Sequence, residues 1–236
     1  MREVRIVARA VWGTIATRAR VLGMTVAGVV AVVVALVVAA RVSVSVESAT
    51  AVIDGLGLSL MIPAASLVFG VAALGDPIDD RTLVYLWLRP VERERIVGGA
   101  AIAALGVSVP LGVVPVVAVA WITSKSASIA AATALAAVLA SVASTSLFVL
   151  LGSITQRALA WGIGYVLIYE QFIARGGKGL GFFSVHSHAV SILARRSRVD
   201  MTADYFSVGT SVVVMVAFSA LALAGATWRM HRLEVA

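Results

Sequence analysis

The segment 21–40 reads VLGMTVAGVVAVVVALVVAA and contains no charged residue, whereas Arg20 and Arg41 stand at its two ends. A helix needs about 20 mostly apolar residues to cross the hydrocarbon core of a bilayer, which is roughly 30 Å thick. We therefore predict that residues 21–40 form a membrane-spanning helix and that the protein belongs to the all-α membrane class.

The composition of the whole chain favours the same class. Of its 236 residues, 61% are hydrophobic and 13% are charged, whereas soluble domains are about half apolar and a quarter charged. A globule of this size exposes much of its surface to water and could not hide so many apolar side chains. The composition therefore excludes an ordinary soluble enzyme and a disordered chain. The absence of cysteine excludes disulfides, thiolate nucleophiles and cysteine metal sites.

Five further apolar segments predict six transmembrane helices in a single domain covering residues 1–236. Pro110 and Pro115 lie inside the third predicted span, so we expect a kink or break there. The fifth span, with 16 residues, would be only about 24 Å long as a helix. The further predicted spans are residues 56–74, 96–122, 127–154, 158–173 and 206–228.

Two shorter helices are predicted outside the spans. Residues 1–20 place apolar residues on one helical stripe, with most of the arginines off it, which predicts an amphipathic helix at the membrane interface. After a glycine-rich break, residues 182–194 are apolar but too short to span. We expect a re-entrant or interfacial helix there, on the extracellular side between spans five and six.

The distribution of charge predicts the sidedness. With both termini in the cytoplasm, the inner segments carry 12 lysine and arginine residues and the outer segments seven. This excess on the inner side, rather than affinity for nucleic acid, accounts for the net charge of +7. All but two of the 19 basic residues are arginine, a bias typical of GC-rich bacterial genomes. We expect a multi-pass protein of a bacterial plasma membrane.

The connection between spans two and three, residues 75–99, reads GDPIDDRTLVYLWLRPVERERIVGG. Asp76 is expected to cap a helix whose first residue is Pro77. The step from Arg89 to Pro90 should end that helix, because a residue before proline avoids the α region.

The predicted helix of residues 76–89 lies at the cytoplasmic surface and carries two aromatic side chains, Tyr85 and Trp87. Their exposure to water would be unfavourable, so either lipid headgroups or a soluble protein must cover them.

This connection resembles that of the ABC-2 type transporter permeases, which carry two acidic residues followed by Gly-Thr-Leu, then Tyr-Leu, then Arg-Pro-Val-x-Arg. Here the sequence is Asp79-Asp80-Arg81-Thr82-Leu83, Tyr85-Leu86 and Arg89-Pro90-Val91-Glu92-Arg93. The six predicted spans, the amphipathic N-terminal helix and the short fifth span extend the resemblance over nearly the whole chain.

The resemblance implies the permease subunit of an ATP-binding-cassette exporter, not an enzyme in its own right. It implies a homodimer, or a heterodimer with a similar subunit, and two separate ATPase subunits that bind ATP and Mg. The chain has no Gly-x-x-x-x-Gly-Lys-Ser/Thr phosphate loop, and we expect it to bind no cofactor or metal. Residues 76–89 would be the coupling helix, with the coupling residues Asp79, Asp80, Thr82, Leu83, Tyr85, Leu86, Trp87, Arg89, Pro90 and Arg93.

Glu170 is the only carboxylate well inside a predicted span, and with Tyr169 it is similar to an aromatic–Glu step common in the family. An acid within the membrane is costly, which favours a functional role. Glu170 could line a translocation path or bond the backbone ends of the re-entrant segment. The alternative is a wet position at the outer interface.

For the other polar residues we expect surface or packing roles rather than functional ones. His186 and His188 are expected on a loop surface rather than at a metal. The hydroxyl residues of the fourth span are expected to pack between helices. They are Ser141, Ser144, Thr145 and Ser146.

Two other function classes stay open. A proton-coupled secondary transporter usually needs several ionisable groups within the membrane, and the single acid disfavours it. A non-transporting anchor or regulatory subunit of a larger complex would carry the same docking helix.

Overall fold

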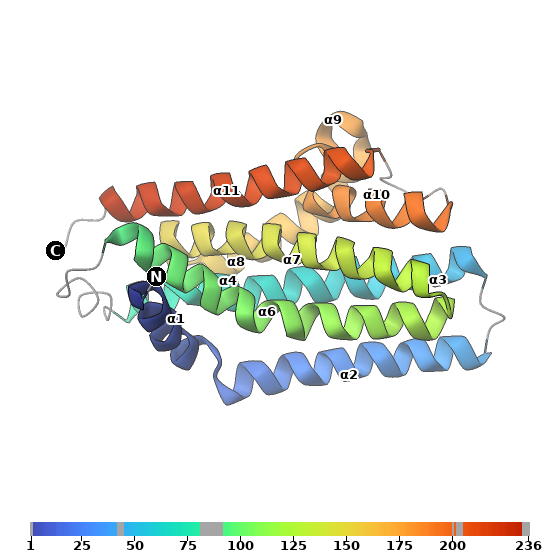
Figure 1. Cartoon of the computed structure of the whole chain (residues 1–236), viewed down its shortest axis with the longest axis horizontal. Helices are drawn as coiled ribbons and strands as arrows, with labels where there is room; N and C mark the ends of the chain where they lie inside the picture. Colours follow the sequence, from blue (N-terminus) through green and yellow to red (C-terminus); the bar gives the residue numbers. More distant parts are fainter. Residues whose placement is uncertain (1, 42–44, 81–91, 200, 202–204, 233–236) are drawn as a thin grey trace.

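A computed structural model describes residues 2–41, 45–80, 92–199, 201 and 205–232, and within these ranges every regular element is a helix (Figure 1). In chain order the helices are α1 (Arg2–Ile15), α2 (Arg18–Arg41), α3 (Val46–Val52), η1 (Ile53–Met61), α4 (Ile62–Asp79), α6 (Arg93–Ser124), α7 (Ala127–Ile154), α8 (Ala158–Gly164), η2 (Tyr165–Ile173), η3 (Ala174–Gly176), α9 (Lys178–Gly181), α10 (Val185–Ser197) and α11 (Val208–Arg232).

Helices α4, α6 and α7 form the centre of an elongated bundle. α2 packs chiefly against α6, and α11 packs chiefly against α7, so these two helices lie on opposite edges of the bundle (Figure 1). We call the end that holds α1, the end of α4 and the end of α11 the terminal end. The opposite end, where α2 ends and α3 begins, is the distal end.

Five helices in the described part of the chain are long and apolar enough to cross a membrane, which makes this an all-α protein of the multi-pass membrane type. Their bounds are Arg18–Arg41, Val46–Asp79, Arg93–Ser124, Ala127–Ile154 and Val208–Arg232. The predicted fifth span is a sixth helical run, formed by seven residues of α8 and nine of η2, and it is too short to belong to this set.

The fourth predicted span has the bounds found for α7, but the second and third differ from prediction. The second helical run begins at Val46, so Asp54 lies inside it rather than before it. α6 runs without a break through Pro110 and Pro115, which corrects the predicted break. A neighbouring helix covers α6 at the second of these prolines: the ring of Pro115 lies 3.2 Å from where a Cβ on Gly28 of α2 would stand, whereas Pro110 is exposed.

The prediction that Asp76 caps a new helix at Pro77 is wrong. α4 continues to Asp79, with Pro77 inside its last turn, and the Asp80 amide donates to the Asp76 carbonyl at 2.9 Å. Pro77 lacks the amide that would bond the Ala73 carbonyl one turn back, yet the helix continues past it to Asp79. The rest of the predicted coupling helix falls in 81–91 and lies outside the described residues, as do Thr82, Leu83, Tyr85, Leu86, Trp87, Arg89 and Pro90.

The amphipathic N-terminal helix corresponds to α1, and protein covers its apolar stripe. Val7, Val11 and Ile15 are buried, and α1 packs mainly against α6. The close approach needs Gly99, because a Cβ there would meet the Val7 side chain at 2.7 Å. α1 is therefore packed onto the bundle rather than resting its stripe on lipid alone, although Trp12 stays half-exposed.

Small and hydroxyl residues bring the central helices together. A Cβ on Gly152 of α7 would lie 2.5 Å from the Val71 carbonyl oxygen of α4, so these backbones are nearly in contact. Ser108 and Thr145 join their hydroxyls at 3.0 Å between α6 and α7, and Ser66 donates to the Ser141 carbonyl at 3.5 Å. These contacts agree with the packing role expected for the hydroxyls of the fourth span.

Candidate functional site

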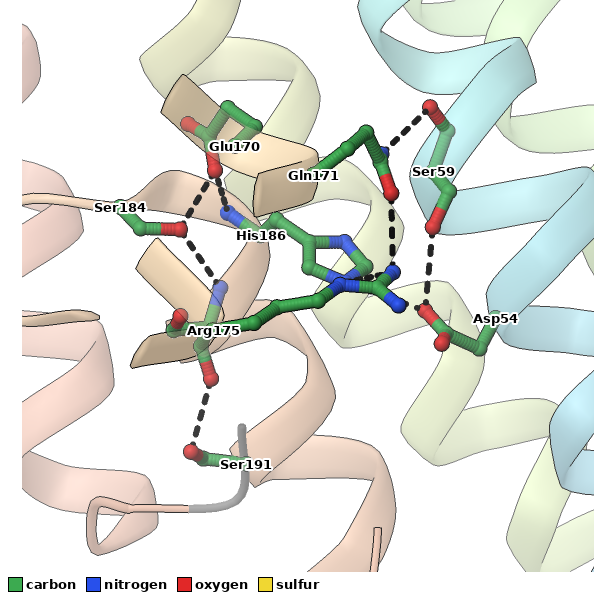
Figure 2. Close-up of polar contacts among 9 residues, drawn as sticks. Asp54, Ser59, Glu170, Gln171, Arg175, Ser184, His186 and Ser191 are labelled. Carbon is green, nitrogen blue, oxygen red and sulfur yellow. Dashed lines mark hydrogen bonds and ion pairs between the residues drawn. The ribbon is translucent and has the colours of Figure 1, made fainter. Parts of the chain in front are cut away.

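A polar cluster of buried and half-buried side chains in the distal half of the bundle joins the second helical run to the end of η2 and the start of α10 (Figure 2). We call it the distal cluster. Two π-helical stretches, η1 and η2, supply four of its side chains, and π-helical turns are frequent at functional sites. Its members are Asp54, Ser59, Glu170, Gln171, Arg175, Ser184 and His186.

Glu170 lies at the centre of four hydrogen bonds and is only 4% exposed. Its Oε1 accepts from the Tyr165 hydroxyl at 2.6 Å and from the Val185 amide at 3.1 Å. Its Oε2 accepts from the Ser184 hydroxyl at 2.5 Å and from the His186 amide at 3.1 Å (Figure 2). This geometry excludes the wet interfacial position.

The carboxylate of Glu170 caps the N-terminus of α10. The first amides of a helix have no partner within the helix, and here Glu170 accepts those of Val185 and His186. Ser184, the N-cap residue, accepts the Ser187 amide at 3.0 Å. A negative charge at this end also opposes the positive end of the helix dipole. Glu170 thus bonds the backbone end of the segment that follows the short fifth run.

The second half of the distal cluster ties η1 to η2 and α10. Gln171 donates to the Ser59 carbonyl at 3.3 Å and accepts from Arg175 at 2.8 Å. Nε2 of His186 lies 3.4 Å from the Arg175 guanidinium and 3.4 Å from the Asp54 carboxylate. The imidazole therefore lies within reach of both charged groups (Figure 2).

The space inside the distal cluster is too small for a substrate. A cavity of about 10 Å³ lies between Glu170, Tyr165, Ser144 and His186, which is room for about one water molecule. In this conformation the cluster is a structural support, and Glu170 does not line an open path.

The two histidines lie in a buried helix, which corrects their expected place on a loop surface. All residues of α10 from Val185 to Ala194 are buried. His188 Nε2 donates to the Phe182 carbonyl at 2.9 Å, and Nδ1 accepts from the Ser211 hydroxyl at 3.3 Å. Burial lowers the pKa of both His186 and His188. The rings diverge, and no group of three metal-ligating side chains occurs in the part of the chain that the structure describes.

The other predicted site residues that are described lie outside the distal cluster. Tyr169 donates its hydroxyl to the Leu180 carbonyl at 2.8 Å, which holds α9 near η2. Asp79 and Asp80 lie at the end of α4, and Arg93 is the first residue of α6.

Sequence reasoning found Glu170 but missed the side chains that surround it. Gln171 and Arg175 have the i, i+4 spacing of a bonded helical pair, which was a usable local signal. Asp54 and His186 had no such local signal, because each meets its partners far along the chain.

No family model matches the chain, and no curated protein matches it.

Proposed function

We propose that the chain is the membrane-spanning permease subunit of an ATP-binding-cassette exporter in a bacterial plasma membrane. The observation that carries the proposal is the order of elements after α7. A helical run too short for an ordinary span is followed by a glycine-rich break and by α10, a buried helix whose N-terminus Glu170 holds. This order is the one expected from the resemblance of the 79–93 segment to ABC-2 permeases.

The placement of the connection between α4 and α6 supports the same proposal. α4 ends and α6 begins at the terminal end, where α1 and the end of α11 also lie (Figure 1). If both termini are cytoplasmic, the connection begins and ends on the side where an ATPase operates. Only a partner can supply the nucleotide site, since the sequence has no phosphate loop.

The proposed mechanism uses two copies of the chain, or one copy and a similar subunit, with two ATPases. Closure of the ATPases on ATP pushes the connection between α4 and α6. The helical bundles then rock against each other and open a path between the subunits toward the outside. The lipid-facing sides of α2 and α11 leave apolar surface for lipid and for a second subunit.

The composition of the complex tests this proposal. The tagged chain should be purified from its own membranes in mild detergent, and its partners identified and counted by mass spectrometry. We expect two copies of a nucleotide-binding ATPase for two permease chains, with ATP hydrolysis in the purified complex. A stable assembly without a nucleotide-binding protein would contradict the proposal and favour the membrane-anchor alternative.

A further inference from the structure

We propose that Asp76 and Arg93 link the two ends of the connection between α4 and α6 to the outermost helices of the bundle, α2 and α11. The inference deepens the proposed function and rests on it. It assigns these residues a positioning role, in which each carries movement of the connection to one helix.

The first link is an ion pair at the terminal end. Arg20, in the first turn of α2, places its Nη1 2.7 Å from the Asp76 carboxylate in the last turn of α4. α2 packs chiefly against α6 rather than α4. The ion pair therefore joins α2 to α4, a helix with which α2 otherwise makes little contact.

The second link is a hydrogen bond from α6 to α11. Nη1 of Arg93, the first residue of α6, donates to the Met230 carbonyl at 2.6 Å. Met230 lies in the last turn of α11, where carbonyls have no amide partner within the helix. A guanidinium there satisfies the carbonyl and complements the negative end of the helix dipole. Arg93 thus acts as a cap supplied by another helix.

The two linked helices are the ones least fixed by packing. Within their apolar windows, 22% of residues are buried in α2 and 22% in α11, compared with 56% in α7. They also stand on opposite edges of the bundle (Figure 1). A displacement of the connection would therefore reach both edges at once, through the polar contacts of Asp76 and Arg93.

Distances measured between spin labels test the two links separately, and the lack of native cysteine gives a clean background. Labels replace the exposed residues Leu22 on α2 and Ala224 on α11, each paired with a label at Ile154 at the end of α7. Asp76→Asn should raise the population of a displaced α2 about two- to fivefold, as expected for weakening of a partly exposed ion pair. It should leave the α11 distance unchanged. Arg93→Gln should raise the population of a displaced α11 and leave the α2 distance unchanged.

The same distances should then be measured in the complex with its ATPase, with a non-hydrolysable ATP analogue and Mg. In the wild type both distances should shift on nucleotide binding. Asp76→Asn should abolish the shift of α2 only, and Arg93→Gln that of α11 only. The charge-swapped pair Arg20→Asp with Asp76→Arg should restore the shift of α2. Glu92→Gln, which removes only an exposed ion pair with Arg95, is the matched control and should behave as wild type.

Two results would overturn the inference, and they differ. If an ATPase binds and both variants keep wild-type distances and shifts, the two contacts do not transmit movement to α2 and α11, while the proposed function stands. If no ATPase accompanies the wild-type chain, the proposed function fails and the transmission role fails with it.

Discussion

Replacing Glu170 by glutamine should raise the hydrogen-exchange rates of the Val185 and His186 amides about tenfold to several thousandfold. Each carboxylate oxygen accepts one backbone amide and one hydroxyl. The NH₂ group of glutamine would replace one oxygen and leave one buried amide without an acceptor, which costs about 1–3 kcal/mol. Loss of the negative charge at the helix N-terminus adds about 0.3–2 kcal/mol, and each 1.4 kcal/mol is roughly tenfold in exchange through local opening.

The matched control for this change is Glu47→Gln. Glu47 is an exposed acid in the first turn of α3, so its replacement removes the same charge near a helix N-terminus without disturbing a buried network. Exchange should be read on peptides covering residues 183–190 of the protein in lipid nanodiscs. We also expect the Glu170 variant to assemble or transport less well. Equal protection in both variants would show that Glu170 does not hold α10.

Replacing Tyr85 and Trp87 together by alanine should leave membrane insertion intact but uncouple ATP hydrolysis from transport. Aromatic anchors at protein interfaces contribute about 2 kcal/mol or more each, so the double change should weaken ATPase binding about a hundredfold or more. In vesicles that contain the chain and its ATPase, the hydrolysis that depends on the chain should fall to the level of the ATPase alone.

The control for the aromatic pair removes two exposed aromatic residues from another part of the chain. Trp161 on α8 and Phe172 on η2 are 67% and 77% exposed, and they belong to the short fifth run. Changing both to alanine removes similar apolar area from the surface but should not alter coupled hydrolysis. If the Tyr85 and Trp87 variant is also fully coupled, the segment does not dock an ATPase.

Apolar length made the long helices predictable, because the thickness of the hydrocarbon core limits how a chain can cross it. α7 has the predicted bounds for this reason. The second span, predicted to begin at residue 56, begins at Val46, and Asp54 lies inside it. Inside the folded bundle its carboxylate lies 3.4 Å from both the Ser59 hydroxyl and His186, so it can lie within a helical run.

The burial of the polar side chains of α10 could not be predicted from local pattern. Its histidines and serines are typical of a surface helix, yet they find partners elsewhere in the fold: His188 meets Ser211, and Ser191 accepts the amides of Tyr205 and Phe206, each at 3.2 Å. Buried polar groups are tolerated when they are bonded, and the bonds here come from tertiary structure. Glu170 was recognised because a lone acid in an apolar segment is conspicuous even in a one-dimensional pattern.

The central claim is that a separate ATPase grips the connection between α4 and α6, and a photo-crosslinking amino acid at position 87 tests it most directly. In native membranes, light should join this position to a nucleotide-binding protein, and Tyr85→Ala should reduce the yield. The same reagent at the exposed position of Trp161 should give lipid adducts only. Lipid adducts alone at position 87, or labelling of that position only from outside the cell, would contradict the account.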